Sequence, residues 1–422
     1  MGRKVLVLGG GGREHALAWA LARSGSVAEV ASAPGNPGTA TLGPTHAVDA
    51  DDPDAVVALA RRLGSDLVVV GPEAPLVAGV VDALAAAGIA AFGPSAAGAE
   101  IEGSKAFAKE IMAAAGAPTG GAVATRDRDE AYAALERFGG PYVVKADGLA
   151  AGKGVRICAD LAEARDAVDD ALLRGVFGSA GSRVVIEEFL DGPERSVFGV
   201  CDGTEVVLLE PAQDYKRALD GDGGLNTGGM GAYTPVPGFA LTDVDQLREL
   251  VFRPVLAELA DRGTPYRGLL YAGLVETAAG PKLLEFNARF GDPETQAILP
   301  RVASDLGELL WAAATGSVAG QDVTWRPEAA VTVVLASGGY PGSYATGVPI
   351  DGVEAAASLP DVEVFHAGTR VDDGRLVTAG GRVLAVTALG GAVAAARARA
   401  YDAADRIGFE GLHRRSDIAA GV

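Results

Sequence analysis

The chain has 422 residues and a formal net charge of −19, and 49% of its residues are hydrophobic. This charge argues against a nucleic-acid surface, because phosphate backbones are bound by clustered lysine and arginine side chains. The length exceeds what one hydrophobic core supports, so we expect two to four modules.

The sequence carries no membrane or disulfide signal. No apolar run approaches the ~20 residues of a membrane span, and Met1 to Lys4 lead directly into a strand-like segment without a signal-peptide pattern. Cys158 and Cys201 make no disulfide framework, and the four scattered histidines argue against a structural zinc site. We therefore expect a soluble, cytoplasmic protein without a membrane or nucleic-acid partner. Its oligomeric state is not readable from the sequence, and a monomer is the starting expectation.

The first hundred residues alternate between strand and helix patterns. Short apolar runs at 4–8, 27–31, 66–70 and 89–92 are typical of strands, and residues 14–22 and 80–87 have helical character. This alternation predicts a doubly wound parallel sheet with helices on both faces, in a module that ends near residue 102.

The glycine-rich turn GGGGREH after the first strand is a candidate anion site. Backbone amides at the start of a helix favour a phosphate group, although a plain strand-to-helix turn explains the glycines equally well. It is a poor dinucleotide fingerprint, because Glu14 or His15 stands at the third glycine position. We expect two more loops at the same sheet edge, PGNPGT with Asn36 and GPEAPL with Glu73, whose carboxylate can bind sugar hydroxyls.

The next segment predicts a helix at 105–115 and then a compact α+β unit over residues 119–190. Within the unit, strands at 142–145 and 184–189 lie on either side of a helix at 161–173. The strands are followed by two motifs, KADGLAAGKG and EEFLDGPE, that are candidates for nucleotide binding.

KADGLAAGKG is not a Walker A motif, because only three residues separate Gly148 from Gly152 and Gly154 replaces the serine or threonine. Its glycines would still let a hairpin fold over a triphosphate, with Lys145 and Lys153 supplying positive charge. EEFLDGPE ends a strand. The backbone at the strand end could bind an adenine edge, and the acidic residue that follows, Glu194, could bind the ribose. A plain strand terminus is the alternative for this second motif.

A loop-rich stretch at 213–237 leads to a hairpin at 271–288 that carries the motif EFNARFGDPE. Two-residue alternation places Glu285, Asn287 and Arg289 on one face of the second strand, with Leu284, Phe286 and Ala288 on the other. A carboxylate and an amide oxygen suit Mg²⁺, and the arginine presents a planar fork to phosphate oxygens. Read alone, this face could also be a solvated surface ion pair.

After about residue 326 the pattern changes to short strands at 330–336, 362–367 and 383–389 and a closing helix at 392–407. We interpret this region as a small, β-rich C-terminal module.

Taken together, these motifs resemble the ATP-grasp superfamily and, within it, the phosphoribosylamine–glycine ligase (glycinamide ribonucleotide synthetase) family. The resemblance covers essentially the whole chain. The motifs that carry it, in order, are GGGGREHALAWAL, GPEAPLVAGVVDAL, EGSKAFAKEIM, VVKADGLAAGKGV, VIEEFLDGPE, QDYKRALDGDGGLNTGGMGAYTP, LLYAGLVETAAGPKLLEFNARFGDPETQ, SGGYPGSY, FHAGT and GGRVLAVTALG.

The resemblance implies an α/β and α+β multidomain fold: a substrate-binding domain at 1–103, an ATP-grasp domain at 104–325 with a mobile lid over about 119–190, and a C-terminal domain at 326–422. It also implies an enzyme of de novo purine biosynthesis. In that reaction ATP, glycine and 5-phosphoribosylamine give glycinamide ribonucleotide, ADP and phosphate through a glycyl phosphate. The implied partners are these small molecules, with Mg²⁺ or Mn²⁺.

The resemblance also implies roles for individual residues. Glu285 and Asn287 would hold the metal. The ATP cleft would be lined by Lys105, Lys145, Gly148, Gly152, Lys153, Gly154, Glu187, Glu188, Leu190 and Glu194. The ribosyl phosphate would face Gly11, Gly12, Glu14, Asn36 and Glu73, with Arg382 as a further phosphate contact suggested by analogy with related ligases. Glycine and the acyl phosphate would be surrounded by the catalytic residues Asp214, Lys216, Arg289 and Asp292.

Two departures from the family pattern and several alternatives stay open. Gly10 stands where many relatives have a polar residue, and Tyr215 stands where histidine is frequent. Asp214, beside Lys216 and Arg217, could equally form a structural ion pair. The nearest alternative function is another ATP-grasp carboxylate–amine ligase of nucleotide metabolism. A regulatory nucleotide-binding protein without catalysis is the alternative from a different class, and a dehydrogenase is disfavoured by the fingerprint.

Overall fold

The N-terminal part is a parallel sheet in the order β2-β1-β3-β4, in a computed structural model that describes residues 2–148, 154–239 and 241–422. The strands are β1 (Arg3–Gly9), β2 (Val27–Pro34), β3 (Leu67–Val70) and β4 (Ala90–Phe92). The helices are α1 (Gly12–Ala22), α2 (Pro53–Leu63), α3 (Glu73–Val77), α4 (Val80–Ala86) and α5 (Ala96–Gly103). The predicted parallel sheet is therefore confirmed.

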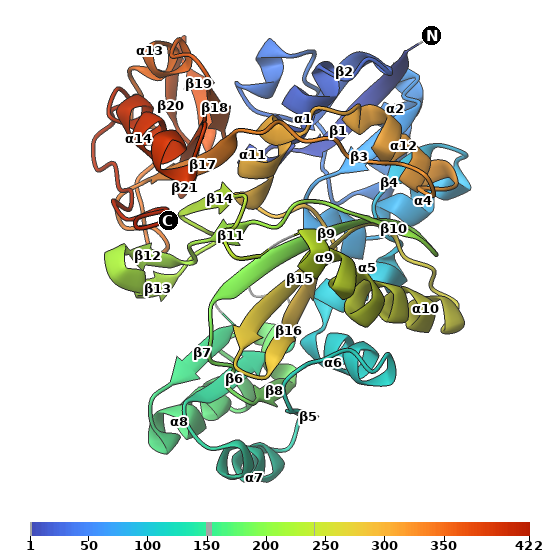
Figure 1. The fold of residues 1–422 in the computed structure, drawn as a ribbon, viewed down its shortest axis with the longest axis vertical. Coiled ribbons are helices and arrows are strands. Elements are labelled where there is room, and N and C mark those ends of the chain that lie inside the picture. Colours follow the sequence, from blue (N-terminus) through green and yellow to red (C-terminus); the bar gives the residue numbers. More distant parts are fainter. Residues whose placement is uncertain (1, 149–153, 240) are drawn as a thin grey trace.

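Helices cover both faces of this sheet because successive side chains of β1 point in opposite directions. Leu6 and Leu8 join the core cluster that contains residues of α2 and α4. Val5 and Val7 join the cluster that contains residues of α1 and of α12 (Leu306–Thr315). The carboxyl ends of the strands face the rest of the molecule (Figure 1).

The middle of the chain forms two antiparallel sheets. One has the order β5-β8-β6-β7 and packs against two helices. Its elements are β5 (Ala122–Thr125), α7 (Arg128–Phe138), β6 (Tyr142–Ala146), β7 (Val155–Cys158), α8 (Leu161–Leu172), the 3₁₀ turn η2 (Gly178–Ser182) and β8 (Val184–Glu187). These elements form the α+β unit that the sequence predicts over 119–190.

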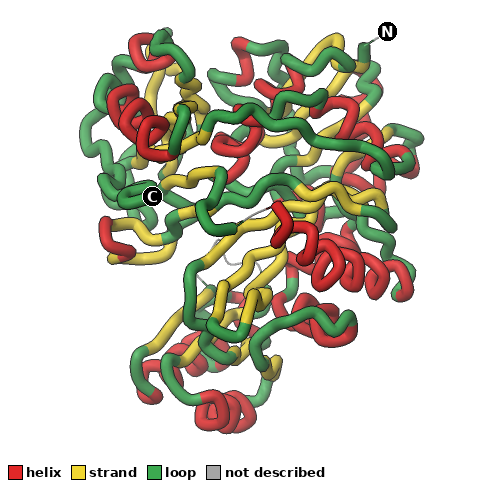
Figure 2. Tube along the Cα trace, viewed as in Figure 1, coloured by secondary structure: helices red, strands yellow, loops and turns green. Residues whose placement is uncertain are grey.

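The second antiparallel sheet has the order β10-β9-β15-β16. Its strands are β9 (Glu194–Asp202), β10 (Val206–Leu208), β15 (Arg267–Thr277) and β16 (Gly280–Asn287). Nearby helices are α6 (Lys105–Ala114), α9 (Leu241–Leu247), the π-helical turn η4 (Arg248–Phe252) and α10 (Arg253–Asp261). Figure 2 shows the β15–β16 hairpin extending toward the β5-β8-β6-β7 sheet. A bridge between Thr119 and Leu283 joins β16 to the segment that leads into β5.

Strand β16 contains a β-bulge that shifts the predicted alternation. Gly273 pairs with Glu285 and Leu274 pairs with Leu283, so Leu284 has no partner on β15. The predicted inner face is therefore wrong at one position: Leu283 is fully buried and Leu284 is only partly buried. Phe286 and Ala288 are buried as predicted.

The stretch at 213–237, predicted to be mostly loop, contains four short strands. They are β11 (Gln213–Asp214), β12 (Arg217–Leu219), β13 (Gly223–Asn226) and β14 (Gly231–Thr234), with the 3₁₀ turn η3 (Asp220–Asp222) between β12 and β13. β12 and β13 form a separate hairpin, whereas β11 and β14 belong to a larger sheet. The loop prediction failed here because strands of two to four residues are too short to show alternation.

That larger sheet has the order β11-β14-β17-β21-β18, so strands from the middle of the chain complete the C-terminal part. The remaining strands are β17 (Ala329–Ala336), β18 (Val362–His366), β19 (Thr369–Asp372), β20 (Arg375–Thr378) and β21 (Arg382–Gly390). The remaining helices are α11 (Glu294–Ile298), η5 (Leu299–Arg301), α13 (Val353–Ala357) and α14 (Val393–Ala404). Of the helices described, none combines the length and apolar character that crossing a bilayer requires.

Candidate active site

The strand face of β16 places Glu285 where several positive charges meet. Burial alone would raise the pKa of this carboxyl, but Lys216, Lys145, Lys105 and Arg289 together hold its pKa below the ordinary value. Among the residues that the structure describes, no side chain forms a hydrogen bond or ion pair with this carboxylate. An ionised carboxylate without a direct partner, facing four cations, is suited to a bound metal and polyphosphate.

The donor set at this position fits magnesium better than zinc. Asn287 lies two residues further on, and its Oδ1 is 3.5 Å from Nη2 of Arg289. Among the described residues, no three or more histidine, cysteine, aspartate or glutamate side chains are placed to hold a metal ion by themselves. Mg²⁺ is ordinarily held by one or two protein oxygens together with substrate phosphates, so Glu285 and Asn287 could supply the ligands that come from the protein.

Two buried lysines share one glutamate beside this face. Glu187, at the end of β8, is 2.9 Å from Nζ of Lys145 and 2.9 Å from Nζ of Lys109. Lys109 also donates to Thr119 Oγ1 at 2.9 Å, and burial lowers the pKa of Lys109 despite the glutamate. The sequence reasoning missed Lys109, although it lies four residues after Lys105 on the same helix and hence on the same face.

Lys105 begins helix α6 and reaches the glycine-rich loop. Its Nζ donates to the carbonyl of Gly148 at 3.4 Å, and burial lowers its pKa while Glu285 opposes the shift. The amide of Ala146 donates to the carbonyl of Gly154 at 2.7 Å. Two predicted loop residues, Gly152 and Lys153, lie outside the described residues.

Asp147 fixes the base of this loop to helix α6. It accepts hydrogen bonds from the amide of Ala106 at 2.7 Å and from Nε of Arg183 at 2.7 Å. Ser104, which caps α6 by accepting from the amide of Phe107, donates to the same carboxylate at 3.1 Å. The lysine face of α6 is thus held in place relative to the loop.

The remaining predicted cleft residues follow β8. Glu188 accepts a hydrogen bond from the amide of Gly121 at 3.0 Å, and this bond helps to hold its pKa below the ordinary value. Leu190 lies against Gly120. A cavity of about 520 Å³ at the junction of α6 and β5 is lined by Lys109 and Gly121 among others, but its lining excludes Lys105, Lys145 and Glu285.

Asp214 and Lys216 face a second acidic cluster. Lys216 Nζ lies 2.5 Å from Oε2 of Glu194, and the described structure shows no ion pair between Asp214 and Lys216. Burial raises the pKa of Asp214 to about 7; Lys216 opposes the shift, whereas Glu294 and Glu194 add to it. Buried Glu294 is fixed by Tyr271, whose hydroxyl donates to it at 2.8 Å.

Arg289 is anchored on three sides rather than free. Its Nη2 lies 3.0 Å from Glu102, its Nε lies 3.3 Å from Glu73, and its Nη1 donates to the carbonyl of Phe290 at 3.1 Å. The other oxygen of Glu102 accepts from the amide of Ala288 at 2.7 Å. Glu73, predicted to bind sugar hydroxyls, is thus a partner of Arg289, and Glu102 is a site residue that the sequence reasoning missed.

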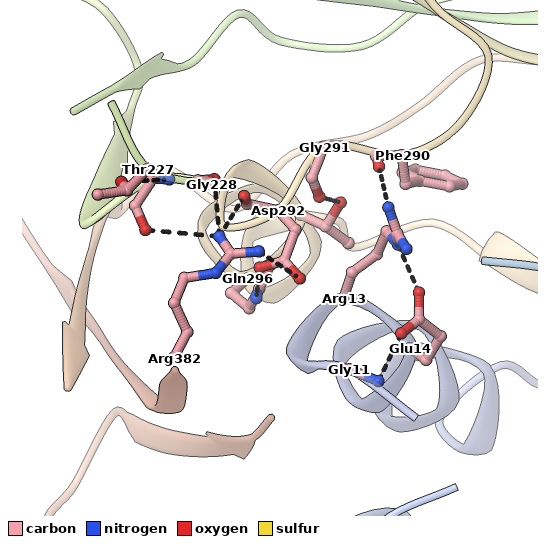
Figure 3. Close-up of polar contacts among 12 residues, drawn as sticks. Gly11, Arg13, Glu14, Thr227, Gly228, Phe290, Gly291, Asp292, Gln296 and Arg382 are labelled. Carbon is pink, nitrogen blue, oxygen red and sulfur yellow. Dashed lines mark hydrogen bonds and ion pairs between the residues drawn. The ribbon is translucent and has the colours of Figure 1, made fainter. Parts of the chain in front are cut away.

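The glycine-rich turn before α1 is organised by its own polar residues (Figure 3). The amide of Gly11 donates to Glu14 at 2.6 Å, and Arg13 pairs with the same carboxylate and donates to the carbonyl of Phe290 at 3.2 Å. A side chain at Gly12 would collide with Nε2 of Gln296, because an added Cβ would lie 2.6 Å from that atom. The turn therefore packs directly against the segment that follows β16.

Asn36 shapes the neighbouring loop instead of projecting from it. Its Nδ2 donates to the carbonyls of Gly10 at 3.0 Å and His366 at 2.8 Å. Its Oδ1 accepts from the amides of Gly38 and Thr39 at 2.9 and 3.0 Å. These contacts make Asn36 a structural link between the N-terminal loops and β18.

Arg382 connects three segments at the same place (Figure 3). Its Nη1 donates to the carbonyls of Asp292 at 2.6 Å and Gly228 at 2.7 Å, and its Nη2 lies 3.3 Å from the Asp292 carboxylate. Gln296 donates to the other carboxylate oxygen at 2.7 Å. Burial would raise the pKa of Asp292, but Arg382 and Arg13 hold it below the ordinary value.

Three family models match consecutive parts of the chain. They are described as the phosphoribosylglycinamide synthetase N domain at residues 3–102, its ATP-grasp (A) domain at 103–295 and its C domain at 330–421. Together the matches extend over most of the sequence.

Individual relatives agree with these matches. A phosphoribosylamine–glycine ligase of Streptomyces coelicolor is 54% identical over 420 residues, covering 99% of each chain, and one of Agrobacterium fabrum is 49% identical over 98% of this chain and 97% of the relative. The crystal structure of the phosphoribosylamine–glycine ligase of Thermotoga maritima has a TM-score of 0.84 at 35% identity, covering 98% of this chain and 100% of the other. A biotin carboxylase domain from Hydrogenobacter thermophilus, at 17% identity and a TM-score of 0.73 over 98% of this chain and 92% of the other, shares the fold.

Proposed function

The chain belongs to the phosphoribosylglycinamide synthetase family, and from that premise we propose how its residues carry out the family's reaction. The reaction is the ATP-dependent ligation of glycine to 5-phosphoribosylamine in purine biosynthesis, giving glycinamide ribonucleotide, ADP and phosphate. We place it in the cytoplasm, with these small molecules as the partners of the chain.

ATP lies in this proposal between the glycine-rich loop and the face of β16. Lys145 and Lys105 neutralise its phosphates, because both lie close enough to the Glu285 carboxylate to lower its pKa. Glu285 and Asn287 would hold Mg²⁺, which when bound would supply positive charge against the phosphate oxygens of ATP. Glu187 pairs with Lys145 at 2.9 Å and holds its ammonium group in place within the buried cluster.

In the first step an oxygen of the glycine carboxylate attacks the γ-phosphorus of ATP. The new oxygen–phosphorus bond replaces the bond to the bridging oxygen, so glycyl phosphate forms and ADP leaves. Arg289 contributes fixed positive charge beside the transferring group, because Glu73 and Glu102 hold its guanidinium in place. A preorganised charge of this kind costs no reorganisation during transfer.

In the second step the amine nitrogen of phosphoribosylamine attacks the carbonyl carbon of glycyl phosphate. A carbon–nitrogen bond forms, the carbon–oxygen bond to phosphate breaks, and the attacking amine loses a proton. We assign acceptance of that proton to Asp214, whose pKa of about 7 suits a general base near neutral pH. Lys216 lies beside the departing phosphate, and the start of α1 at Gly12 and Arg13 holds the ribosyl phosphate.

The observation that carries the proposal is the set of four cations around the carboxylate of Glu285, which has no direct partner within the described part of the chain. Initial rates of ADP release are measured with phosphoribosylamine generated in situ. We expect turnover only when ATP, glycine and phosphoribosylamine are all present. Turnover that persists with bicarbonate or formate in place of glycine would contradict the proposed reaction.

Two further measurements sharpen this test. Glycine labelled with ¹⁸O in its carboxylate must deliver one label to the released phosphate, because that oxygen stays on phosphorus when the amine displaces it. Glu285→Gln should abolish turnover, whereas Lys282→Gln on the same strand, whose nearest acidic partner is Glu188 at 3.6 Å, is the matched control and should retain it. Unlabelled phosphate would exclude the glycyl phosphate intermediate.

A further inference from the structure

The C-terminal segment, residues 413–419, lies against the β12–β13 hairpin, and Figure 1 shows the end of the chain beside these two strands. Nε2 of His413 lies 2.7 Å from the carbonyl of Ala218. The amide of Ser416 donates to Asp220 at 2.8 Å, and the amide of Gly221 donates to Asp417 at 2.8 Å. The hairpin is therefore held by a segment almost 200 residues away in the sequence.

Arg415 is the centre of this contact. Its side chain is only 1% exposed, and its Nε and Nη2 each lie 2.7 Å from the Asp417 carboxylate in a bidentate pair. Its Nη1 donates to Asp222 at 2.8 Å and to the carbonyl of Arg217 at 3.2 Å. A bidentate, charge-assisted pair of this kind fixes geometry as well as contributing stability.

Tyr215 carries the contact from the C-terminal segment to the candidate site. The guanidinium of Arg415 lies 4.9 Å from the centre of the Tyr215 ring, and the Tyr215 hydroxyl accepts from the amide of Ala419 at 2.9 Å. Tyr215 stands between Asp214 and Lys216. Arg415 pairs with Asp222 and Asp417, whereas Lys216 pairs with Glu194, so the polar surroundings of Arg415 are separate from those of the site.

Backbone hydrogen bonds join Tyr215 and Lys216 to the segment that follows β13. The carbonyl of Tyr215 accepts from the amide of Met230 at 2.7 Å, and the carbonyl of Lys216 accepts from the amide of Thr227 at 2.7 Å. Displacement of the hairpin would therefore be transmitted to Lys216 and, through Thr227, to the neighbouring Gly228 that Arg382 binds.

We infer that Arg415 is a positioning residue for the ligase reaction: it holds Tyr215 and the β12–β13 hairpin so that Asp214 and Lys216 face Glu194 and the acyl phosphate. This role rests on the proposed function, because it is defined by where those two residues act. Arg415 itself pairs with Asp222 and Asp417 and touches no substrate.

The inference is tested with Arg415→Met, which removes the fork, Arg415→Lys, which keeps the charge, and Asp222→Asn. The third variant weakens the contact from the hairpin side by removing the charge of Asp222, whose side chain is 70% exposed. Arg399→Met is the matched control: Arg399 also belongs to the C-terminal part but pairs with Asp361 at 3.0 Å, away from the hairpin.

Turnover and affinities are measured for all four variants. We expect Arg415→Met to lower kcat about tenfold or more and to raise the KM for glycine, since misplacement of site residues by about 1 Å can cost up to 10²-fold. The KM for ATP should stay within about twofold, because the cleft lysines lie on other elements. Arg415→Lys should recover part of the loss, Asp222→Asn should lose less than Arg415→Met, and Arg399→Met should match the unmodified chain.

Hydrogen–deuterium exchange of the peptide spanning 213–229, without substrates, gives a readout independent of activity. Faster exchange there in Arg415→Met, with unchanged exchange in α6 and β8, supports the positioning role. Absence of glycine-dependent turnover in the unmodified chain would refute only the proposed function. Unchanged kcat and exchange in Arg415→Met and Asp222→Asn would overturn the inference. So would an equal loss of ATP affinity and turnover, since that would indicate general loosening.

Discussion

Acidification should destabilise the contact between helix α1 and strand β18, where buried His15 lies beside partly buried His366. Nδ1 of His15 accepts a hydrogen bond from the backbone amide of His366 at 2.8 Å, and the ring of His15 lies edge-on to Phe365. A backbone amide can only donate, so protonation of Nδ1 would set two donors against each other. Burial lowers the pKa of His15 to about 3 and that of His366 to about 4.

The magnitude follows from proton linkage. Between about pH 4 and 6.5 the unfolded chain binds more protons at these histidines than the folded chain, so stability rises with pH and is lost as pH falls. At pH 5, each histidine, with a pKa of 6.5 in the unfolded chain, lowers the free energy of unfolding by about 2 kcal/mol. Because His366 is only partly buried, we expect the pair to lower the free energy of unfolding by ~3 kcal/mol. That loss is a large share of the typical total of about 5–15 kcal/mol for a folded protein.

Urea unfolding at pH 7, 6 and 5 measures this loss. His15→Gln keeps a hydrogen-bond acceptor for the amide of His366 but cannot titrate, so the fall in unfolding free energy between pH 7 and 5 should shrink by about 2 kcal/mol. The value at pH 7 controls for the static cost of the substitution. Asp292, whose pKa is held below its ordinary 3.8, does not titrate in this range. An equal fall in the variant and the unmodified chain would refute the reasoning.

Three further outcomes are expected from the site. Asn287→Ala should reduce turnover in initial-rate assays and regain part of it at higher Mg²⁺, because Glu285 remains as a ligand; no gain across a magnesium titration would contradict the metal role. Glu187→Gln should lower the unfolding free energy in urea by about 3 kcal/mol or more, since it leaves two buried lysines without their shared counter-charge; an unchanged urea midpoint would argue against this. Arg289→Lys should lower kcat on the order of 10²-fold through loss of its fork, and near-normal turnover would exclude its proposed role.

Local sequence patterns predicted the elements whose signals are local. The parallel sheet, the α+β unit and the hairpin of β15 and β16 follow from apolar periodicity and turn residues. Our prediction omitted several helices, including α2, α7, α10 and α12. For α2, Asp52, the proline at position 53 and Gly64 are all helix-end signals. That omission was avoidable, whereas the bulge at Leu284 leaves no mark in the local pattern.

Contacts between distant parts of the chain could not be read from local patterns. Glu102 and Ala288 are 186 residues apart, and nothing near either residue selects one from the 55 acidic side chains. The charge face at Glu285 could be predicted because strand alternation gathers its residues. The anchoring of Arg289 and the shared glutamate of Lys109 depend on how separate modules dock, which only the folded chain specifies.

The five-stranded sheet has a consequence for the order in which the chain is made. Strand β14 ends at Thr234, but its neighbour β17 begins at Ala329, about 95 residues later. At the usual elongation rate of about 5–20 residues per second, β14 emerges from the ribosome roughly 5–20 s before its partner exists. During that interval an unpaired strand edge is exposed to other nascent chains. Translation speed across residues 235–328 should therefore influence the yield of folded protein.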